Sequence, residues 1–178
     1  MLIGKNPLNE APEWFVKNIA ERPEECSVNV NGANVKYFIW GDKSKKPLLL
    51  LHGYNAHSFW WDHIAPSLTE NHCVVGLDFS GMGESDRREV YSQEIFVDDV
   101  KGVIDDLSWK SCTCIAHSMG GSIATLATSI YPDIFEHLIL LDSMIVIPPN
   151  VAERMSSNRP SARLVVASPD LELSLIHI

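Results

Sequence analysis

Ser118 is the residue of this sequence that is best placed to do chemistry. It lies in the stretch Ala116-His117-Ser118-Met119-Gly120, directly after a β-type run and directly before a helix-type run. A serine at a sharp strand-to-helix turn has its hydroxyl pushed out of the sheet, an arrangement called a nucleophile elbow. The small residues Ala116 and Gly120 suit such a turn, because its backbone passes close to the neighbouring strand and helix. The pattern therefore predicts a nucleophilic serine, with an ordinary turn or N-cap serine as the alternative.

A nucleophilic serine needs partners. Its hydroxyl attacks a carbonyl only when a base accepts the proton and when hydrogen-bond donors already face the oxyanion that forms. Because Ser118 opens a helix, the backbone N–H groups of the first helical turn favour negative charge there. The turn thus predicts half of an acyl-transfer site, and the base and acid have to come from elsewhere.

Two motifs precede Ser118. The apolar run Leu48–Leu51 is followed by His52-Gly53-Tyr54, and a second apolar run is followed by the glycine-punctuated loop 78–86. Together with the Ser118 turn, in this order, they resemble the α/β-hydrolase fold family. The resemblance covers roughly residues 28–142, and three motifs in order are much more specific than one.

The resemblance implies a role for each motif. Ser118 would attack an ester, thioester or related acyl bond of a small-molecule substrate, and the backbone N–H groups of Met119 and Tyr54 would hold the oxyanion. A serine at the elbow disfavours the chemistry of haloalkane dehalogenases and epoxide hydrolases, in which a carboxylate attacks. Carbon–carbon bond hydrolases, peptidases and cofactor-free peroxidases remain open. The expected supporting residues are His52, which would orient the loop through hydrogen bonds, Gly53, His117, which would point away from Ser118, and Gly120.

The acid and the base follow the serine in the family's chain order. Asp142 is the candidate acid, although the family's acid more often follows a further strand that we do not expect here; the alternative is a structural role. His137 opens the last expected strand, and at ~3.3 Å per residue it lies ~16 Å from the site. His177 lies in 173–178, a segment whose reverse translation resembles a transposon end used in DNA sequencing, so we interpret it as a non-native adapter-derived tail. We therefore expect the base to lie beyond this chain.

The elements that must position these residues alternate between strand and helix. This alternation predicts an α/β fold, with a mostly parallel sheet and helices on both faces, truncated before the last two strands of the family's sheet. Sites in such sheets gather where strands end, which is where Tyr54, Ser118 and Asp142 fall. The expected strands are 28–30 and 35–40, flanking a tight turn at Asn31-Gly32, then 48–51, 73–77, 112–116 and 138–142; the expected helices are 13–22, 58–68, 92–107 and 120–130.

Three segments are expected along the chain. Residues 1–142 would form a partial α/β-hydrolase core, 143–172 the start of a lid or cap segment, and 173–178 the tail. Strand 138–141 would then lie at an exposed sheet edge, which is an aggregation hazard. We expect an isolated chain that is poorly soluble and inactive.

Several other side chains receive structural interpretations. Asp78 should brace the turn Gly81-Met82-Gly83, and the acidic residues of the helix 92–107 should lie mostly on a solvated face. Trp60 and Trp61 either line a substrate pocket or pack against the core. The acidic residues concerned are Asp98, Asp99, Asp105 and Asp106, and we expect the cysteines Cys26, Cys73, Cys112 and Cys114 to be buried free thiols.

The composition excludes several classes of function. Of the 178 residues, 46% are hydrophobic and 21% charged, as in soluble globular proteins. The net charge of −9 argues against nucleic acid as a partner. No apolar run reaches the ~18 residues of a membrane span, and the start lacks a secretory signal, so we expect a cytoplasmic protein. We expect no metal or organic cofactor, and the sequence does not predict an oligomeric state. The rival hypotheses are a non-catalytic ligand-binding protein of the same fold and a short protein that borrows a histidine from a partner chain.

Overall fold

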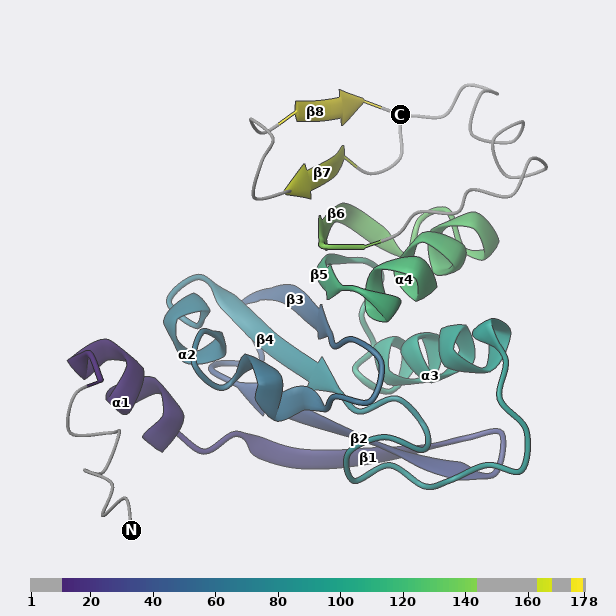
Figure 1. Ribbon diagram of the computed structural model, residues 1–178, viewed down its shortest axis with the longest axis horizontal. Helices are drawn as coiled ribbons and strands as arrows, with labels where there is room; N and C mark the ends of the chain where they lie inside the picture. The colour runs from purple at the N-terminus through teal and green to yellow at the C-terminus, as the bar shows by residue number, and fades with distance from the viewer. Residues whose placement is uncertain (1–10, 144–162, 168–173, 178) are drawn as a thin grey trace, which may run out of the picture.

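The computed structural model describes residues 11–143, 163–167 and 174–177. Their strands form one sheet with helices packed against it (Figure 1). The strands are β1 (Glu24–Val30), β2 (Ala33–Trp40), β3 (Lys46–Leu51), β4 (His72–Leu77), β5 (Cys112–His117), β6 (Phe135–Leu141), β7 (Arg163–Ala167) and β8 (Ser174–His177). The helices are α1 (Glu13–Ala20), the 3₁₀ helix η2 (Ser58–Trp61), α2 (Ala65–Leu68), α3 (Gln93–Asp106) and α4 (Met119–Ile130).

The sheet order is β1-β2-β4-β3-β5-β6-β7-β8. Strands β4, β3, β5, β6 and β7 run parallel to one another, whereas β1, β2 and β8 are antiparallel to their neighbours. The prediction of a mostly parallel sheet in an α/β fold is confirmed. Because the parallel strands end on the same side, Leu51, Leu77, His117 and Leu141 mark one edge of the sheet, which we call the carboxyl edge.

The first two strands, β1 and β2, form the predicted antiparallel hairpin. β1 and β2 pair from Glu24↔Ile39 to Val30↔Ala33. The turn between them is Asn31-Gly32, with φ of +48° and +86°. Both turn positions need positive φ, which asparagine and glycine tolerate best.

The core lies on both faces of the sheet. The four leucines of β3 alternate: Leu49 and Leu51 join the cluster under α3 and α4, while Leu48 and Leu50 join a second cluster with Trp61 of η2 and with Ala65. Side chains of successive strand residues point to opposite faces, so a continuous apolar run is what a strand covered on both faces requires. Helices therefore cover both faces, as predicted, with α3 and α4 on one and η2 and α2 on the other (Figure 1).

Helix α3 begins and packs as its sequence predicts, with one exception. The side chain of Ser92 caps it by accepting a hydrogen bond from the Ile95 N–H at 3.3 Å. The exception is Asp99, which we expected on the solvated face but which is fully buried. It is buried because Arg88 bonds Oδ1 at 2.9 Å and the Ser80 N–H bonds Oδ2 at 2.8 Å, two non-local partners that the spacing of residues along the helix does not reveal.

The predicted continuous helix 58–68 is wrong. The chain forms η2, then a break, then the short α2. Pro66 explains the break, because proline has no N–H for the carbonyl of Asp62 and its ring would collide with that carbonyl in a continuous helix. At the break, Ile64 has φ −122° and ψ −29°, away from helical values.

The expectation that Leu138–Leu141 lies at an exposed edge is also wrong. β7 pairs with β6 in parallel from His137↔Arg163 to Leu141↔Ala167, and β8 pairs with β7. The backbone groups of β7 satisfy those that β6 would otherwise leave unpaired. β7 falls in the range 143–172 that we assigned to the start of a lid. Apart from Ser143 and β7 itself, that range lies outside the described residues, so the lid remains a prediction.

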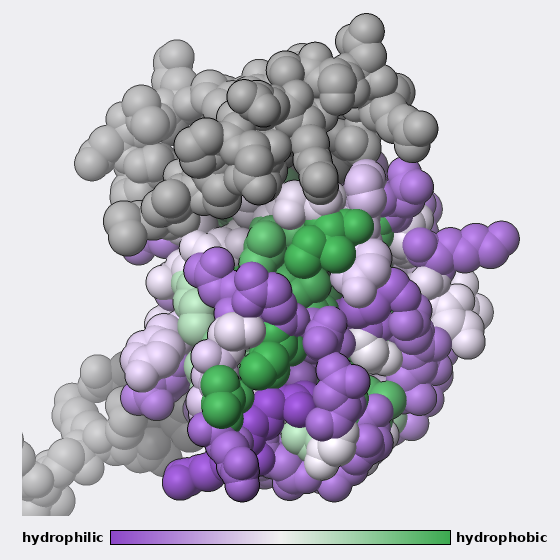
Figure 2. Space-filling model, turned by 90° about the vertical axis from the view of Figure 1, so that its right-hand side faces the viewer, coloured by the Kyte–Doolittle hydropathy of each residue, from purple (hydrophilic) through white to green (hydrophobic). Residues whose placement is uncertain are grey.

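The described surface is mixed. Figure 2 shows a mostly hydrophilic face crossed by a band of hydrophobic residues. Among the residues that the structure describes, no helix has the length and apolarity needed to cross a bilayer. The described cysteines are all free thiols; Cys73, Cys112 and Cys114 are buried, whereas Cys26 is only half-buried, in contrast to our expectation. Cys26 is less covered because β1 is the first strand of the sheet and has a neighbour on one side only.

Candidate active site

Ser118 stands at a strained turn between β5 and α4. Its φ of +51° and ψ of −118° lie in a region that glycine usually occupies, and serine pays for it with local strain. The backbone N–H of Ser118 donates to the carbonyl of Leu141 at 3.0 Å, which joins the turn to the end of β6. The geometry is that of the predicted elbow at the carboxyl edge.

The loop after β3 lies directly against this turn. A Cβ added to Gly53 would come within 3.2 Å of the Ser118 Cβ and 2.9 Å of His117 Nδ1. A Cβ added to Gly120 would come within 2.6 Å of the His52 carbonyl oxygen and 2.9 Å of that of Leu51. Close backbone approach therefore requires glycine at position 120, and the close side chains of His117 and Ser118 favour it at position 53. The two glycines bring the start of α4 and the loop after β3 together around Ser118.

His52 is fully buried, and both of its ring nitrogens are engaged. Nε2 accepts a hydrogen bond from the Phe79 N–H at 3.2 Å, so the proton of the neutral ring is on Nδ1, which donates to the Gly53 carbonyl at 2.7 Å. Burial lowers the pKa of His52, and the hydrogen bond to Gly53 and the charge of Asp78 oppose this only in part. A neutral ring with both nitrogens occupied orients the loop and is not available as a base for Ser118.

This hydrogen bond also sets the direction of the Tyr54 N–H. The Gly53 carbonyl accepts from His52 and from the Ala56 N–H at 3.3 Å. The peptide that joins Gly53 to Tyr54 is planar and trans, so its N–H points opposite to that carbonyl. Within the described part of the chain, no hydrogen bond uses the backbone N–H of Tyr54 or of Met119 as its donor. These two N–H groups, one in the loop after β3 and one directly after Ser118 in the chain, therefore have no protein acceptor among the described residues.

His117 packs beside the nucleophile candidate. Its ring stacks on the Trp60 ring, with centroids 5.6 Å apart and planes 13° apart. The ring also lies close to Gly53, as the added-Cβ distance indicates. Trp60 itself is half exposed, whereas Trp61 is buried in the core. The stack was not predicted, because nothing in the local spacing connects residue 60 with residue 117.

Asp142 comes immediately after β6, with φ +46° and an exposed side chain. It therefore lies at the carboxyl edge, next to the Leu141 carbonyl that accepts from Ser118. No described hydrogen bond or ion pair joins its carboxylate to a histidine. Its role as the acid remains a prediction.

The histidines that follow Ser118 lie elsewhere. His137 and His177 are both level with Arg163, the first residue of β7. They belong to the opposite edge of the sheet, several residues along the strands from Leu141. The expectation that His137 cannot reach Ser118 agrees with this register. The described residues bring no histidine with a free ring nitrogen and a carboxylate partner to Ser118.

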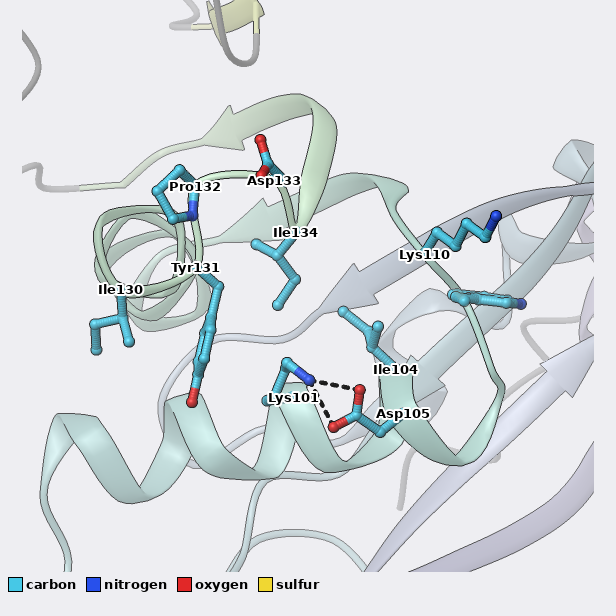
Figure 3. Close-up of a pocket in the computed structure, with 10 residues that line it drawn as sticks. Lys101, Ile104, Asp105, Lys110, Ile130, Tyr131, Pro132, Asp133 and Ile134 are labelled. Atoms are coloured by element: carbon cyan, nitrogen blue, oxygen red, sulfur yellow. Dashed lines mark hydrogen bonds and ion pairs between the residues drawn. The ribbon is translucent and has the colours of Figure 1, made fainter. Parts of the chain in front are cut away.

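A separate cavity of about 360 Å³ lies between the ends of α3 and α4 (Figure 3). Its walls include Trp109 and Lys110, just before β5, and Asp133 and Ile134, just before β6. This position is at the edge opposite to Ser118. Lys101, in one wall, is already paired with Asp105 at 2.5 Å. The cavity is therefore not part of the candidate site.

The chain is similar to known proteins in both sequence and structure. A profile of the alpha/beta hydrolase fold family matches residues 46–175. The "Serine hydrolase-like protein" of Danio rerio is 33% identical over 68% of this chain and 38% of its own length, and "Epoxide hydrolase 4" of Mus musculus is 33% identical over 66% and 34%. A bacterial membrane phospholipase A has a similar structure, with a TM-score of 0.68 and 29% identity over 75% of this chain and 44% of its own. The chain thus spans less than half the length of these proteins.

Proposed function

The chain belongs to the α/β-hydrolase family, and we propose that it is the front part of a serine hydrolase that acts on an ester, thioester or related acyl bond. The Ser118 oxygen attacks the acyl carbon and its proton passes to a base. The leaving alcohol or thiol takes up that proton and departs, and water then releases the acid from the acyl-enzyme.

The observation that carries the proposal is the backbone of Ser118. A non-glycine residue held at φ +51° and ψ −118° is costly, and such strain gathers at functional sites. Such strain at a strand-to-helix turn is what exposes a serine hydroxyl as a nucleophile, and the N–H of the next residue, Met119, opens the helix that follows.

The residue type at position 118 distinguishes between the two kinds of chemistry that the relatives represent. Both a serine hydrolase-like protein and an epoxide hydrolase are similar to this chain to the same degree, so similarity alone does not choose between them. A carboxylate attacks in the epoxide-opening members of the family, and this chain has a serine at that point. We therefore assign it to acyl transfer.

The acid and the base complete the proposal. Asp142 is one candidate acid, at the end of β6. Because β7 supplies a strand beyond β6, Asp170, which follows β7 and lies outside the described residues, is the other. We assign the base to a histidine in the part of the family's fold that this chain does not cover. The 178 residues alone are accordingly expected to be inactive.

Labelling with a fluorophosphonate tests the proposal. The full-length product of the gene should be labelled at Ser118, the Ser118→Ala variant should not, and the isolated 178 residues should be labelled far more slowly than the full-length product. In full-length protein, Asp142→Asn and Asp170→Asn separate the two acids, since only the true acid should reduce turnover of a p-nitrophenyl ester strongly. A full-length protein that binds acyl compounds but is never labelled would favour the non-catalytic ligand-binding alternative.

A further inference from the structure

The loop from His52 to Ser58 is tied at both of its ends to the end of β4. At its first end, His52 accepts from the backbone N–H of Phe79. At its last end, the backbone N–H of Ser58 donates to Oδ1 of Asp78 at 2.6 Å, and the Ser58 hydroxyl donates to the same oxygen. Consecutive residues, 78 and 79, thus hold the two ends of the segment that carries the Tyr54 N–H.

Asp78 is itself immobilised. Its backbone N–H donates to the Lys36 carbonyl at 2.9 Å, and its carbonyl accepts from the Ser85 hydroxyl at 2.6 Å. The second carboxylate oxygen, Oδ2, accepts from the Glu84 N–H at 2.8 Å. The backbone of Gly83 packs so closely on this carboxylate that a Cβ at that position would overlap it. Asp78 therefore braces the 81–83 turn with one carboxylate oxygen, as predicted, and holds Ser58 with the other.

The carboxylate is buried and has no cationic partner among the described ion pairs. An ionised carboxylate is an acceptor only, so burying it requires donors that are aimed at it. Two of its three donors come from Ser58. Hydrogen bonds to a charged group are stronger than neutral ones, and the position of Ser58 is consequently fixed more firmly than that of a residue held by an ordinary contact.

We propose that Asp78 is a positioning residue, which acts through Ser58 to hold the loop 52–58, and with it the Tyr54 N–H, against Ser118. The proposal rests on the proposed function. It assigns to the residues that directly follow β4 a role in setting the oxyanion donor. His52 sets the direction of the Gly53–Tyr54 peptide, and Asp78 prevents the far end of the loop from moving away.

The chain offers a matched pair of variants. Ser58→Ala and Ser85→Ala each remove one buried hydroxyl that donates to Asp78, but only Ser58 belongs to the loop. Two measurements apply to both: amide hydrogen exchange of residues 53–57 in the chain, and the rate of Ser118 labelling by fluorophosphonate in the full-length protein. Asp78→Asn, which keeps the side-chain volume, serves as a second variant if Ser58→Ala does not fold.

We expect Ser58→Ala to increase exchange at 53–57 about tenfold and to slow labelling about tenfold, with kcat for an ester reduced more than KM changes. This is less than the ~10²–10³-fold loss for deleting an oxyanion donor, because the donor is displaced and not removed. Ser85→Ala removes a bond to the Asp78 carbonyl and none to its carboxylate, so it should change both readings much less than Ser58→Ala, even where its melting temperature falls as much.

Equal exchange at 53–57 in the two serine variants, or unchanged labelling of Ser58→Ala, would overturn the positioning role. Increased exchange in Ser58→Ala together with a wild-type protein that is never labelled would overturn the proposed function, and the catalytic meaning of Asp78 with it, while supporting its hold on the loop.

Discussion

The backbone N–H of Phe79 points at Nε2 of His52 from 3.2 Å, so this ring nitrogen is held as an acceptor in the folded chain. A proton on Nε2 would face another N–H and would place a charge in a fully buried position. Burial accordingly lowers the pKa of His52. The unfolded chain, whose histidine titrates near pH 6.5, binds this proton more readily than the folded one.

The stability of the chain should therefore depend on pH through His52. We expect the free energy of unfolding to fall as pH drops below about 6.5, since protons then bind preferentially to the unfolded state. His52→Gln removes the titrating group, so its unfolding free energy should fall less between pH 7 and pH 5, measured by urea unfolding. His137→Gln, at an exposed position, is the control and should keep the wild-type slope. Equal slopes for wild type and His52→Gln would contradict the prediction.

The strain at Ser118 predicts an inverted preference between alanine and glycine. Ser118→Gly should be more stable than Ser118→Ala by about 1–2 kcal/mol, because glycine adopts φ +51° and ψ −118° without the cost that a Cβ imposes. Urea unfolding of the two variants measures the difference. At Ser129, inside α4, the order should reverse, with alanine more stable by about 0.5–1 kcal/mol. The same order at both positions would show that the turn is not strained.

Much of the site could be predicted from local sequence. The elbow at Ser118 follows from a β-type run, small residues and a helix-type run in order, and the buried strand β3 from four consecutive leucines. The hairpin turn at Asn31-Gly32 was likewise predicted, because positive φ has few acceptable residue types. In each case one short segment contains all the physical information that decides its conformation.

Features that depend on distant partners could not be predicted in this way. Asp99 has the helical spacing of a solvated residue, and only Arg88 and Ser80, from a folded-back loop, explain its burial. The stack of Trp60 on His117 joins a helix to a strand end. β7 was missed because a short β-branched run after a polar segment gives no sign of which strand edge it will pair with.

Gly120 offers a test of how closely α4 must approach β3. Gly120→Ala should destabilise the chain by about 1–3 kcal/mol, because its Cβ would meet backbone oxygens of His52 and Leu51, which have little room to move. It should also slow labelling of Ser118, since α4 and the loop after β3 separate. Gly102→Ala is the comparison: it lies inside α3, where the atoms nearest to its Cβ belong to the Val30 side chain, so we expect labelling to stay as in wild type. A Gly120→Ala protein with wild-type stability would show that the approach is loose.

The buried pair Arg88–Asp99 predicts strong coupling in a double-mutant cycle. Asp99→Ala alone should cost about 3–5 kcal/mol of unfolding free energy, because it leaves the Arg88 guanidinium buried without its carboxylate. Arg88→Ala alone leaves the fully buried Asp99 with only the Ser80 N–H that bonds it. The double variant should therefore cost less than the sum of the two by about 1 kcal/mol or more, as expected for residues in contact. The exposed pair Lys43–Glu24 provides the contrast, and its coupling should be much smaller because solvent screens both charges. Additive losses at Arg88 and Asp99 would mean that the pair does not anchor the loop to α3 as a unit.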